Sequence, residues 1–318
     1  MQFISQEGRL DKILQLELGQ TRNQVENFIK TGNVTVDDKV IKKCGYKLKG
    51  GEVVKYKIKS AKEQSEDCRV DFDVDILYED DDILVINKPP FLTVHQAPSV
   101  KEATLVDWLK TRGVSLSTIS GDERHGIVHR IDKQTSGALV VAKNNEAHLN
   151  LSKQLQDKSM GRYYLALVDM PLKENSIVEK AIARNRNNRL KMGVDERGKI
   201  ARSAFLKLML SNDLKTELIS AKLFTGRTHQ IRVHLNSISR HILGDNLYGF
   251  KSKKGKIKRV MLHAYLLYLS HPRTGKELLI KAPLFDDFKE VLQEKFNMEK
   301  IDEKIDPSYI INSFDAFC

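Results

Sequence analysis

Cysteine is scarce in this chain of 318 residues. Only Cys44, Cys68 and Cys318 are present, and no two of them form a C-x-x-C pair. A disulfide framework needs paired cysteines, and a structural zinc site needs clustered ones. Neither kind of cross-link is therefore expected to hold this fold together.

Long apolar runs are also missing. The longest, residues 260–269, is too short to cross a bilayer and is interrupted by His263. The amino terminus lacks a basic segment followed by an apolar one, which a secretory signal would need. We expect a cytoplasmic protein that makes no membrane contact.

The sequence also lacks clear motifs for binding a metal or a cofactor. His229 and His234 are five residues apart, about 140° around a helix, so they do not share a face. His125 and His129 have helical ligand spacing, but Gly126 and the β-branched residues after it disfavour a helix. No Gly-rich phosphate loop or dinucleotide fingerprint occurs. We expect neither a metal nor a cofactor.

Positive charge is what the chain has in excess. Lys and Arg (53) outnumber Asp and Glu (42), a formal net charge of +11, and 41% of the residues are hydrophobic. The composition indicates a globular protein of one large domain or two unequal ones, and the charge predicts a polyanionic partner. Basic residues gather in the first 60 residues, around 184–202 and at 251–259.

Residues 1–60 have a pattern of their own. Apolar residues at helical spacing predict two short amphipathic helices: Leu10, Ile13, Leu14 and Leu18, then Val25, Phe28 and Ile29 after a cap-like Thr21. Gly32 ends the second helix, a strand at 34–36 and an Asp37-Asp38 turn follow, and alternation over 54–59 predicts another strand. The lysines of that strand fit either a solvated face or a surface that binds phosphates.

This segment resembles the S-four-type RNA-binding module of ribosomal proteins. The resemblance rests on Gly-Arg-Leu-Asp-Lys at 8–12, Thr-Arg-Asn at 21–23 and Ile-Lys-Thr-Gly-Asn-Val-Thr-Val at 29–36. It implies a small α/β domain over 1–60 in which Arg9, Lys12, Arg22 and Lys30 contact RNA.

An acidic stretch separates this segment from a larger one. We interpret 61–75 as a linker whose negative charge keeps it away from RNA. Residues 76–297 mix short apolar runs with helical segments and predict an α+β domain with a mixed sheet. Residues 298–318 form a tail to which we assign no role.

Asp132 stands in the most informative segment, 129–143, which reads His-Arg-Ile-Asp-Lys-Gln-Thr-Ser-Gly-Ala-Leu-Val-Val-Ala-Lys. A polar loop leads into a buried strand at 138–141, so Asp132 is expected at the mouth of a sheet. Between Arg130 and Lys133 its carboxylate should stay ionised, which suits a nucleophile or base. A salt-bridged structural loop explains the same residues equally well.

Arg227 occupies a second such segment, Thr-Gly-Arg-Thr-His-Gln-Ile-Arg-Val-His-Leu at 225–235. Thr228 is a plausible helix cap, and Ile231, Leu235 and Ile238 form an apolar stripe. Arg227 would then lie at the helix start, where its guanidinium can reach a carboxylate. A purely structural ion pair remains the alternative.

Together these segments resemble the RluA family of RNA pseudouridine synthases. Further matching motifs lie at 87–95, 162–168, 243–249 and 262–264, and all occur in family order between about residues 76 and 288. The resemblance implies an α+β pseudouridine synthase fold, with a mixed, largely antiparallel sheet and flanking helices. It implies a cofactor-free isomerase that converts uridine in RNA to pseudouridine.

The resemblance also implies residue roles. Asp132 would be the catalytic carboxylate, and Arg227 would pair with it. Tyr164, rather than Tyr163, would pack on the uracil, although its alternation with Ala166 and Val168 also permits a core aromatic. Beyond these, the RNA contacts we expect in this domain are His129, Arg130 and Thr135.

The partner we expect is RNA, most specifically 23S ribosomal RNA or the pre-50S particle, bound by a monomer. One alternative is a non-catalytic RNA-binding or ribosome-assembly protein with a degenerate synthase domain, but Asp132, Tyr164 and Arg227 are all present. Another is a DNA-binding factor, which no recognition-helix or zinc-finger pattern supports.

Overall fold

The protein divides into two compact units, Met1–Arg69 and Val70–Cys318. The structure, a computed structural model, describes residues 2–18, 22–56, 70–96, 100–119, 125–250 and 257–318. Residues 57–59 of the predicted strand and 61–69 of the predicted linker lie outside the described residues. In the part of the chain that is described, no helix has the length and apolar character needed to cross a bilayer.

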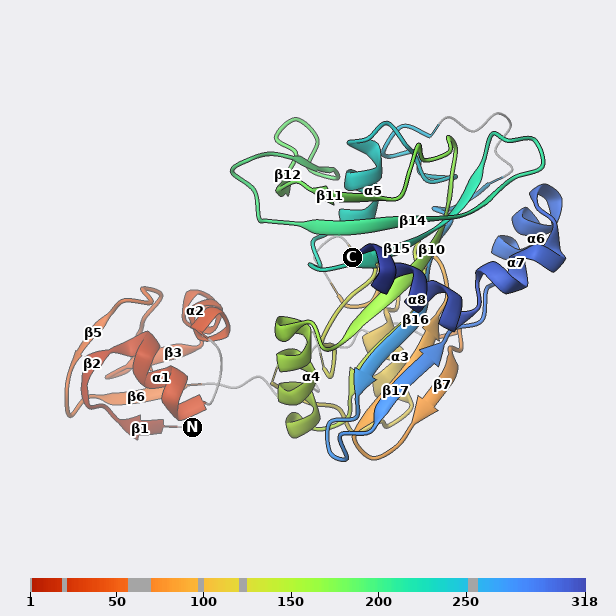
Figure 1. Cartoon of the computed structure of the whole chain (residues 1–318). Coiled ribbons are helices and arrows are strands. Elements are labelled where there is room, and N and C mark those ends of the chain that lie inside the picture. Colours follow the sequence, from red (N-terminus) through yellow and green to blue (C-terminus); the bar gives the residue numbers. More distant parts are fainter. Residues whose placement is uncertain (1, 19–21, 57–69, 97–99, 120–124, 251–256) are drawn as a thin grey trace. The chain divides into compact units, whose positions relative to one another are not determined.

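The smaller unit combines two helices with short strands (Figure 1). Its elements are β1 (Gln2–Ile4), β2 (Glu7–Arg9), α1 (Leu10–Leu18), α2 (Arg22–Lys30), β3 (Val34–Val36), β4 (Lys39–Val40), β5 (Lys47–Lys49) and β6 (Val53–Tyr56). Strands β1, β6, β3 and β4 form one sheet in that order, and β2 pairs with β5.

Both predicted helices of this unit are confirmed. Leu10 and Leu14 of α1 and Val25 and Ile29 of α2 are fully buried in one apolar cluster, as their spacing requires. The predicted turn before β4 is confirmed too, because Asp37 and Asp38 have φ values of 46° and 62°. Asp tolerates this left-handed region better than most residues, so the turn follows from the local sequence.

The larger unit is built around a nine-stranded sheet. Its elements are β7 (Asp75–Glu79), β8 (Ile83–Lys88), α3 (Leu105–Thr111), β9 (Ser136–Ala142), α4 (Asn145–Asp157), β10 (Gly161–Val168), β11 (Ser176–Glu179), β12 (Ile182–Arg184), β13 (Met192–Val194), β14 (Arg202–Leu210), β15 (Glu217–Leu223), α5 (Gln230–Asn236), β16 (Leu262–Ser270), β17 (Glu277–Lys281), α6 (Asp286–Lys295), α7 (Met298–Lys304) and α8 (Pro307–Phe317).

The strands of this sheet run in the order β11-β14-β15-β10-β16-β9-β8-β7, with β17 pairing with β16. All of these pairs are antiparallel except β9 with β16, which is parallel. The prediction of a mixed, largely antiparallel sheet is therefore confirmed.

Both faces of the sheet are covered. Along β8, Leu84 and Ile86 pack into the main core with α3, whereas Ile83 and Val85 pack into a second cluster with α4. This alternation follows from the two-residue repeat of a strand, and a strand covered on both faces becomes a continuous apolar run. Strand β9, predicted as buried, has all seven residues buried.

Residues 298–318 form α7 and α8, which pack on the main core. Ile301, Ile310 and Phe314 are fully buried, and the Phe314 ring lies 5.3 Å from that of Tyr163 on β10. The end of the chain thereby supports the strand that also carries Tyr164.

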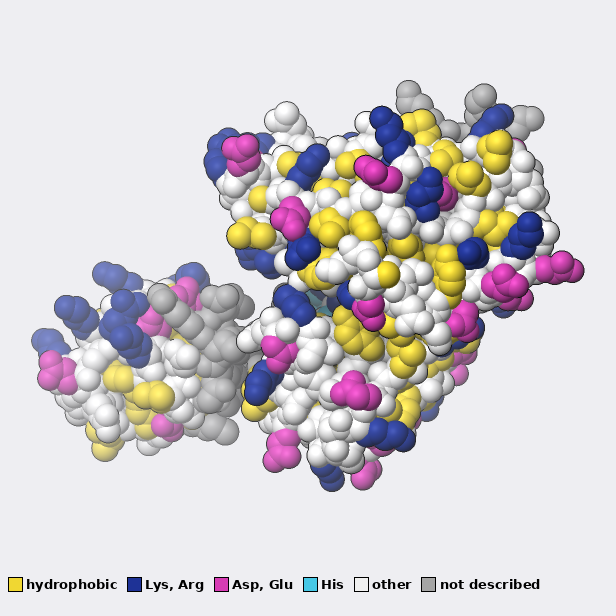
Figure 2. All heavy atoms as spheres, in the orientation of Figure 1, with side chains coloured by type: hydrophobic (Ala, Val, Ile, Leu, Met, Phe, Trp, Pro, Cys, Tyr) yellow, Lys and Arg dark blue, Asp and Glu magenta, His cyan; other side chains and the backbone are white. Residues whose placement is uncertain are grey.

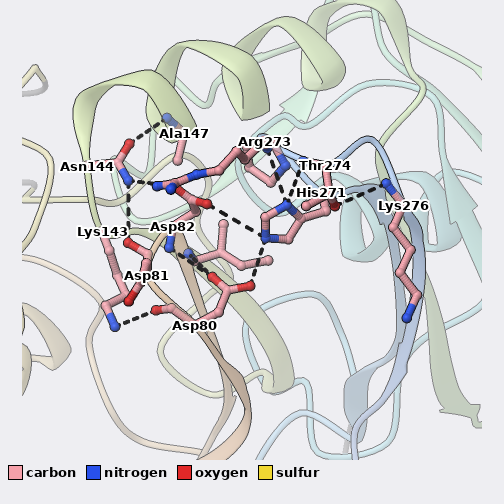
Figure 3. Close-up of polar contacts among 12 residues, drawn as sticks. Asp80, Asp81, Asp82, Lys143, Asn144, Ala147, His271, Arg273, Thr274 and Lys276 are labelled. Atoms are coloured by element: carbon pink, nitrogen blue, oxygen red, sulfur yellow. Dashed lines mark hydrogen bonds and ion pairs between the residues drawn. The ribbon is translucent and has the colours of Figure 1, made fainter.

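A polar junction joins the β7–β8 turn to the β16–β17 turn (Figure 3). His271 Nε2 lies 2.7 Å from Asp80 Oδ2, and Arg273 Nη2 donates to Asp82 Oδ1 at 2.6 Å. Asn144 also donates to Asp82, while its own side-chain oxygen caps α4 by accepting from the Ala147 N–H. One set of contacts thus connects two hairpin turns and the start of a helix.

Three potential metal ligands occur in this junction, since side-chain atoms of Asp80, Asp82 and His271 lie within 4.8 Å of one another. Their hydrogen bonds assign them to protein partners instead. His271 Nδ1 accepts from the backbone N–H groups of Arg273 and Thr274, so Nε2 carries the ring proton and donates it to Asp80. Hydrogen bonds to protein groups thus engage the ligand atoms of all three residues, as expected of a structural junction.

Candidate active site

A cavity of about 470 Å³ opens in the larger unit. Its wall is formed by the loop before β9, by β10, by the β15–α5 loop and by the start of α5. Asp132, Tyr164, Arg227 and Arg232 all line it. Three segments far apart in the sequence therefore contribute polar side chains to one space.

The loop that carries Asp132 is fixed by a buried lysine. Lys88 is fully buried, and its ammonium donates to the carbonyls of Pro89 at 2.7 Å, Leu92 at 2.9 Å and Lys133 at 3.3 Å. Burial lowers the pKa of Lys88 to about 7. The contact with Lys133 ties the residue next to Asp132 to the end of β8.

The other end of the same loop enters the sheet through Gly137. This residue has a φ of +112°, and a Cβ atom there would lie 2.3 Å from the Ala264 carbonyl oxygen. Only glycine allows β9 and β16 to approach this closely. Next to it, Ser136 Oγ lies 2.8 Å from His263 Nδ1, while His263 Nε2 donates to the Ala282 carbonyl at 3.1 Å.

Asp132 forms its ion pair with Arg232. Arg232 Nη1 donates to Asp132 Oδ2 at 3.3 Å, and the Asp132 side chain is 17% exposed. The same guanidinium binds Asp245 in a bidentate fashion, through Nε at 2.7 Å and Nη2 at 2.8 Å. Because Asp245 is 1% exposed, this second pair is buried and fixes the orientation of Arg232.

His229 is the second group that faces Asp132. Its Nε2 lies 3.9 Å from Asp132 Oδ2, and its Nδ1 lies 2.8 Å from the Tyr248 hydroxyl. The same hydroxyl accepts from the Met192 N–H at 2.7 Å, so Tyr248 links the His229 ring to β13. Burial lowers the pKa of His229, and the ring is neutral at pH 7.

The prediction that Arg227 pairs with Asp132 is wrong. Arg227 Nε donates instead to the carbonyl of Ile200 at 3.0 Å. Helix α5 begins at Gln230, so the predicted cap at Thr228 is also wrong, and the N-cap is His229 with a φ of 58°. Arg227 consequently lies in the loop before the helix, and Arg232 lies in its first turn.

Gln230 causes this shift of the helix start. Its side-chain oxygen accepts from the Arg227 N–H at 3.0 Å and from the Thr225 hydroxyl at 2.7 Å, and its amide nitrogen donates to Arg202 and Ser203. These contacts hold the loop away from helical geometry. The only sequence signal for Arg232 was a second arginine five positions after the first.

Tyr164 lines the cavity from β10 and is 4% exposed. Burial raises the pKa of its hydroxyl, an effect that the nearby Arg162 guanidinium opposes, so Tyr164 stays in the phenol form at neutral pH. Tyr163 instead packs against Tyr268, with ring centroids 5.5 Å apart. The structure thus brings Tyr164, and not Tyr163, to the same cavity as Asp132.

The predicted RNA contacts near Asp132 differ in exposure. Arg130 is exposed, whereas Thr135 is 2% exposed at the cavity wall. The His129 ring contacts the Arg162 guanidinium and accepts from the Val140 N–H at 3.2 Å. Burial lowers the pKa of His129 well below its usual value, so this ring is neutral.

Cationic side chains are prominent on the smaller unit, and Figure 2 shows many of them on the face in view. Lys12 and Lys30 are exposed, and Arg9 makes a bidentate pair with the buried Asp11 at 3.0 and 2.7 Å. Arg22 begins α2, and its side chain lies outside the described residues.

Two family models match this chain. Residues 82–237 match the RNA pseudouridylate synthase family, and residues 8–54 match the S4 domain. The first range includes Asp132, Tyr164, Arg227 and Arg232, and the second covers most of the smaller unit.

Relatives match along nearly the whole chain. An uncharacterized RNA pseudouridine synthase from Helicobacter pylori is 47% identical over 315 residues, which cover 97% of this chain and 96% of that protein. The ribosomal large subunit pseudouridine synthase D from Nitrosomonas europaea is 37% identical and covers 91% and 85%. The solved structure of human RNA Pseudouridylate Synthase Domain Containing 1 has a TM-score of 0.53 at 24% identity, over 70% of this chain and 94% of that one, and supports the fold.

The chain therefore belongs to the RNA pseudouridine synthase family. Within that family it is an enzyme of the RluA type that carries an N-terminal S4 domain. The resemblance seen in the sequence is thereby confirmed, and so is the isomerase activity that it implied.

Proposed function

We propose that this enzyme converts uridines of 23S ribosomal RNA to pseudouridine and that Asp132 is its catalytic carboxylate. The ribosomal target is supported by relatives named ribosomal large subunit pseudouridine synthase D and by the S4 domain. The role of Asp132 is supported by one observation above all, its ion pair with Arg232 in the wall of the cavity.

The reaction needs no partner other than the RNA. The bond between ribose C1′ and uracil N1 breaks, the base turns, and C1′ joins to C5. The proton at C5 is lost and N1 gains one, so the atoms balance within the nucleotide. No electrons are exchanged with a second molecule.

Asp132 supplies a negative charge where the sugar and base react. An ionised carboxylate can attack C1′, add to the uracil ring or remove a ribose proton, and each of these steps requires the deprotonated form. Arg232 places a positive charge against this carboxylate, and Asp245 keeps the guanidinium in place. His229 adds a neutral imidazole ring on the same side of the carboxylate.

The target nucleotide must leave the base stack before it can enter the cavity. At about 470 Å³ the cavity is within the usual range of small-molecule sites, roughly 300–1,000 Å³, and suits a single flipped nucleoside. Exposed Arg130 lies two residues from Asp132 and can hold a phosphate or fill the vacated position in the stack. Tyr164 packs on the uracil and assists removal of the C5 proton.

Asp132→Asn tests the catalytic assignment. The amide is nearly isosteric but cannot ionise, so product formation should fall by at least about 10³-fold while RNA affinity stays within about twofold. Pseudouridine formed by the purified protein on ribosomal RNA from cells that lack it is the readout. Substantial turnover by Asp132→Asn would remove Asp132 from the mechanism.

The substrate is tested separately by pseudouridine maps of ribosomal and transfer RNA from cells with and without the protein. We expect at least one 23S position to lose its modification when the protein is absent. An unchanged ribosomal map together with a missing transfer-RNA site would overturn the substrate assignment and leave the catalytic one intact.

A further inference from the structure

A second cavity, of about 430 Å³, adjoins the one that holds Asp132. Both are lined by Gly226, Arg227 and Thr228, so Arg227 stands between them. The other side of the second cavity is formed by β12, β13 and residues 197–199. Any chain of nucleotides that leaves the first cavity past Arg227 meets this surface.

The β12–β13 hairpin is firmly attached at its base. Ile182 is 2% exposed and packs in a small cluster with Val233 and Tyr248, and Met192 N donates to the Tyr248 hydroxyl at 2.7 Å. Lys199 pairs with Ile182 through two backbone hydrogen bonds of 2.9 Å. A Cβ at Gly198 would lie 2.5 Å from the Ile182 carbonyl, so only glycine lets this loop close on β12.

The cavity is strongly cationic. Arg184, Arg197, Lys199 and Arg227 line it, and Asp195 neutralises only Arg197, through hydrogen bonds of 3.0 and 3.1 Å. Among the described residues, no carboxylate lies within ion-pair distance of Arg184, Lys199 or Arg227. Arg184 and Arg227 each use one N–H on a backbone carbonyl, which orients the guanidinium and leaves its other donors available.

Apolar side chains are exposed on this hairpin and in the segment that follows it. Leu190 is 75% exposed, Val194 46% and Ile200 79%. Figure 2 shows Lys and Arg side chains around the region where Figure 1 labels β12. Cations beside exposed aliphatic groups suit a nucleic-acid strand better than a free anion, because the strand offers bases as well as phosphates.

We propose that this cavity binds a backbone phosphate of the RNA strand next to the target uridine, through Arg184, Lys199 and Arg227. The inference rests on the proposed function only in naming the strand as substrate. It also gives a role to Arg227, which does not take part in the Asp132 ion pair. Its guanidinium holds the strand at the boundary between the two cavities.

The test is a double variant, Arg184→Gln/Lys199→Gln, in the full-length protein. Both side chains are exposed, so the fold should be unaffected. The matched control is Lys215→Gln/Lys276→Gln, which removes two exposed lysines from the β14–β15 and β16–β17 turns, away from both cavities. Affinity for a ribosomal RNA fragment is measured over a range of salt concentrations.

The double variant should bind this RNA about 10-fold more weakly at low salt, while the control stays within about twofold of the wild type. The slope of log K against log salt should become shallower by about 0.7 to 1.4, as expected for one or two lost phosphate contacts to a single strand. KM for pseudouridine formation should rise by the same factor as the dissociation constant. A double variant that matches the control in affinity and slope overturns the proposal.

Inorganic phosphate distinguishes the strand from a free anion. If phosphate binds the wild type at micromolar concentration and the double variant keeps full RNA affinity, the cavity binds a free anion and the RNA assignment fails. Failure of the proposed function is a different result, in which the pseudouridine map of 23S ribosomal RNA is unchanged in cells without the protein. In either case, the RNA affinities of the wild type, the double variant and the control show whether the second cavity binds a phosphate of the strand.

Discussion

Arg232 donates one guanidinium N–H to Asp132 at 3.3 Å and two more to the buried Asp245. Two different carboxylates therefore bind the same guanidinium, one to orient it and one as the group that faces the cavity. Asp245 holds the arginine in place, and the free edge of the guanidinium meets the carboxylate that faces the cavity. Asp245, which is not among the residues that line the cavity, thus orients the arginine that pairs with Asp132.

Arg232→Lys should therefore keep the positive charge at this position but lose the simultaneous hydrogen bonds to Asp245 and Asp132. A lysine ammonium cannot bind Asp245 through two parallel bonds and reach Asp132 as well. We expect kcat to fall by about 10²-fold or more, as when a positioned donor is removed from an active site. Single-turnover pseudouridine formation measures the loss, and circular dichroism confirms the fold.

Arg227→Gln provides the contrast. Because Arg227 lies outside the Asp132 ion pair, its loss should appear in KM and in RNA affinity, by several-fold, and not in kcat. If Arg227→Gln lowered kcat as strongly as Arg232→Lys does, the assignment of the counter-ion to Arg232 would be wrong.

Tyr164→Phe removes only the hydroxyl that lines the cavity. We expect turnover to fall by about 10²-fold with RNA affinity unchanged, because the aromatic ring, which we propose to pack on the base, is retained. Tyr163→Phe is the matched control, since Tyr163 packs on Tyr268 and Phe314 away from the cavity and its loss should leave turnover intact. Equal activity of both variants would restrict Tyr164 to a packing role.

Gly137→Ala should disturb the entrance of the Asp132 loop. The new methyl group would collide with the Ala264 carbonyl, and alanine disfavours a φ of +112°. We expect a loss of about 2–3 kcal/mol, or a melting temperature lower by about 5–10 °C. Gly226→Ala is the control for stability, because nothing lies within 4 Å of a Cβ there. A Gly137→Ala protein that melts at the wild-type temperature would contradict this account.

The junction around Asp80 predicts a pH dependence of stability. Burial alone raises the pKa of Asp80, but hydrogen bonds from Tyr78, His271 and the Asp82 and Ile83 N–H groups outweigh it and lower the pKa from 3.8 to about 2. A pKa depressed by folding contributes stability above the unfolded value, and this is lost as the pH falls from about 4 towards 2.

Asp80→Asn should accordingly cost about 1–2 kcal/mol at pH 7, and the difference from the wild type should close as the pH approaches 2. Denaturant unfolding of both proteins at a series of pH values measures it. A difference that stays constant between pH 7 and pH 2 would show that the ionised form of Asp80 contributes nothing specific.

Much of the local structure follows from the sequence, because it depends on neighbouring residues. The spacing of Leu10 and Leu14 is enough to predict α1, and the apolar run before Ala142 predicts the buried strand β9. The motif around Asp132 likewise depends on contiguous residues. By contrast, the hydrophobic pattern of residues 298–318 is weak, and the burial of their apolar side chains depends on contacts with the main core of the larger unit.

The partner of Asp132 is what only the tertiary structure decided. The sequence analysis predicted Arg227, and the partner that Asp132 has in the structure depends on where helix α5 begins. The hydrogen bonds of the Gln230 side chain to Arg202 and Ser203 on a distant strand set that point, and Asp245, from another loop, then fixes Arg232. Residue types and spacings thus predicted the family and the candidate carboxylate Asp132, whereas long-range contacts selected its ion-pair partner. The physical reason is that a helix turns about 100° with each residue, so the residue at which it begins decides which arginine faces Asp132.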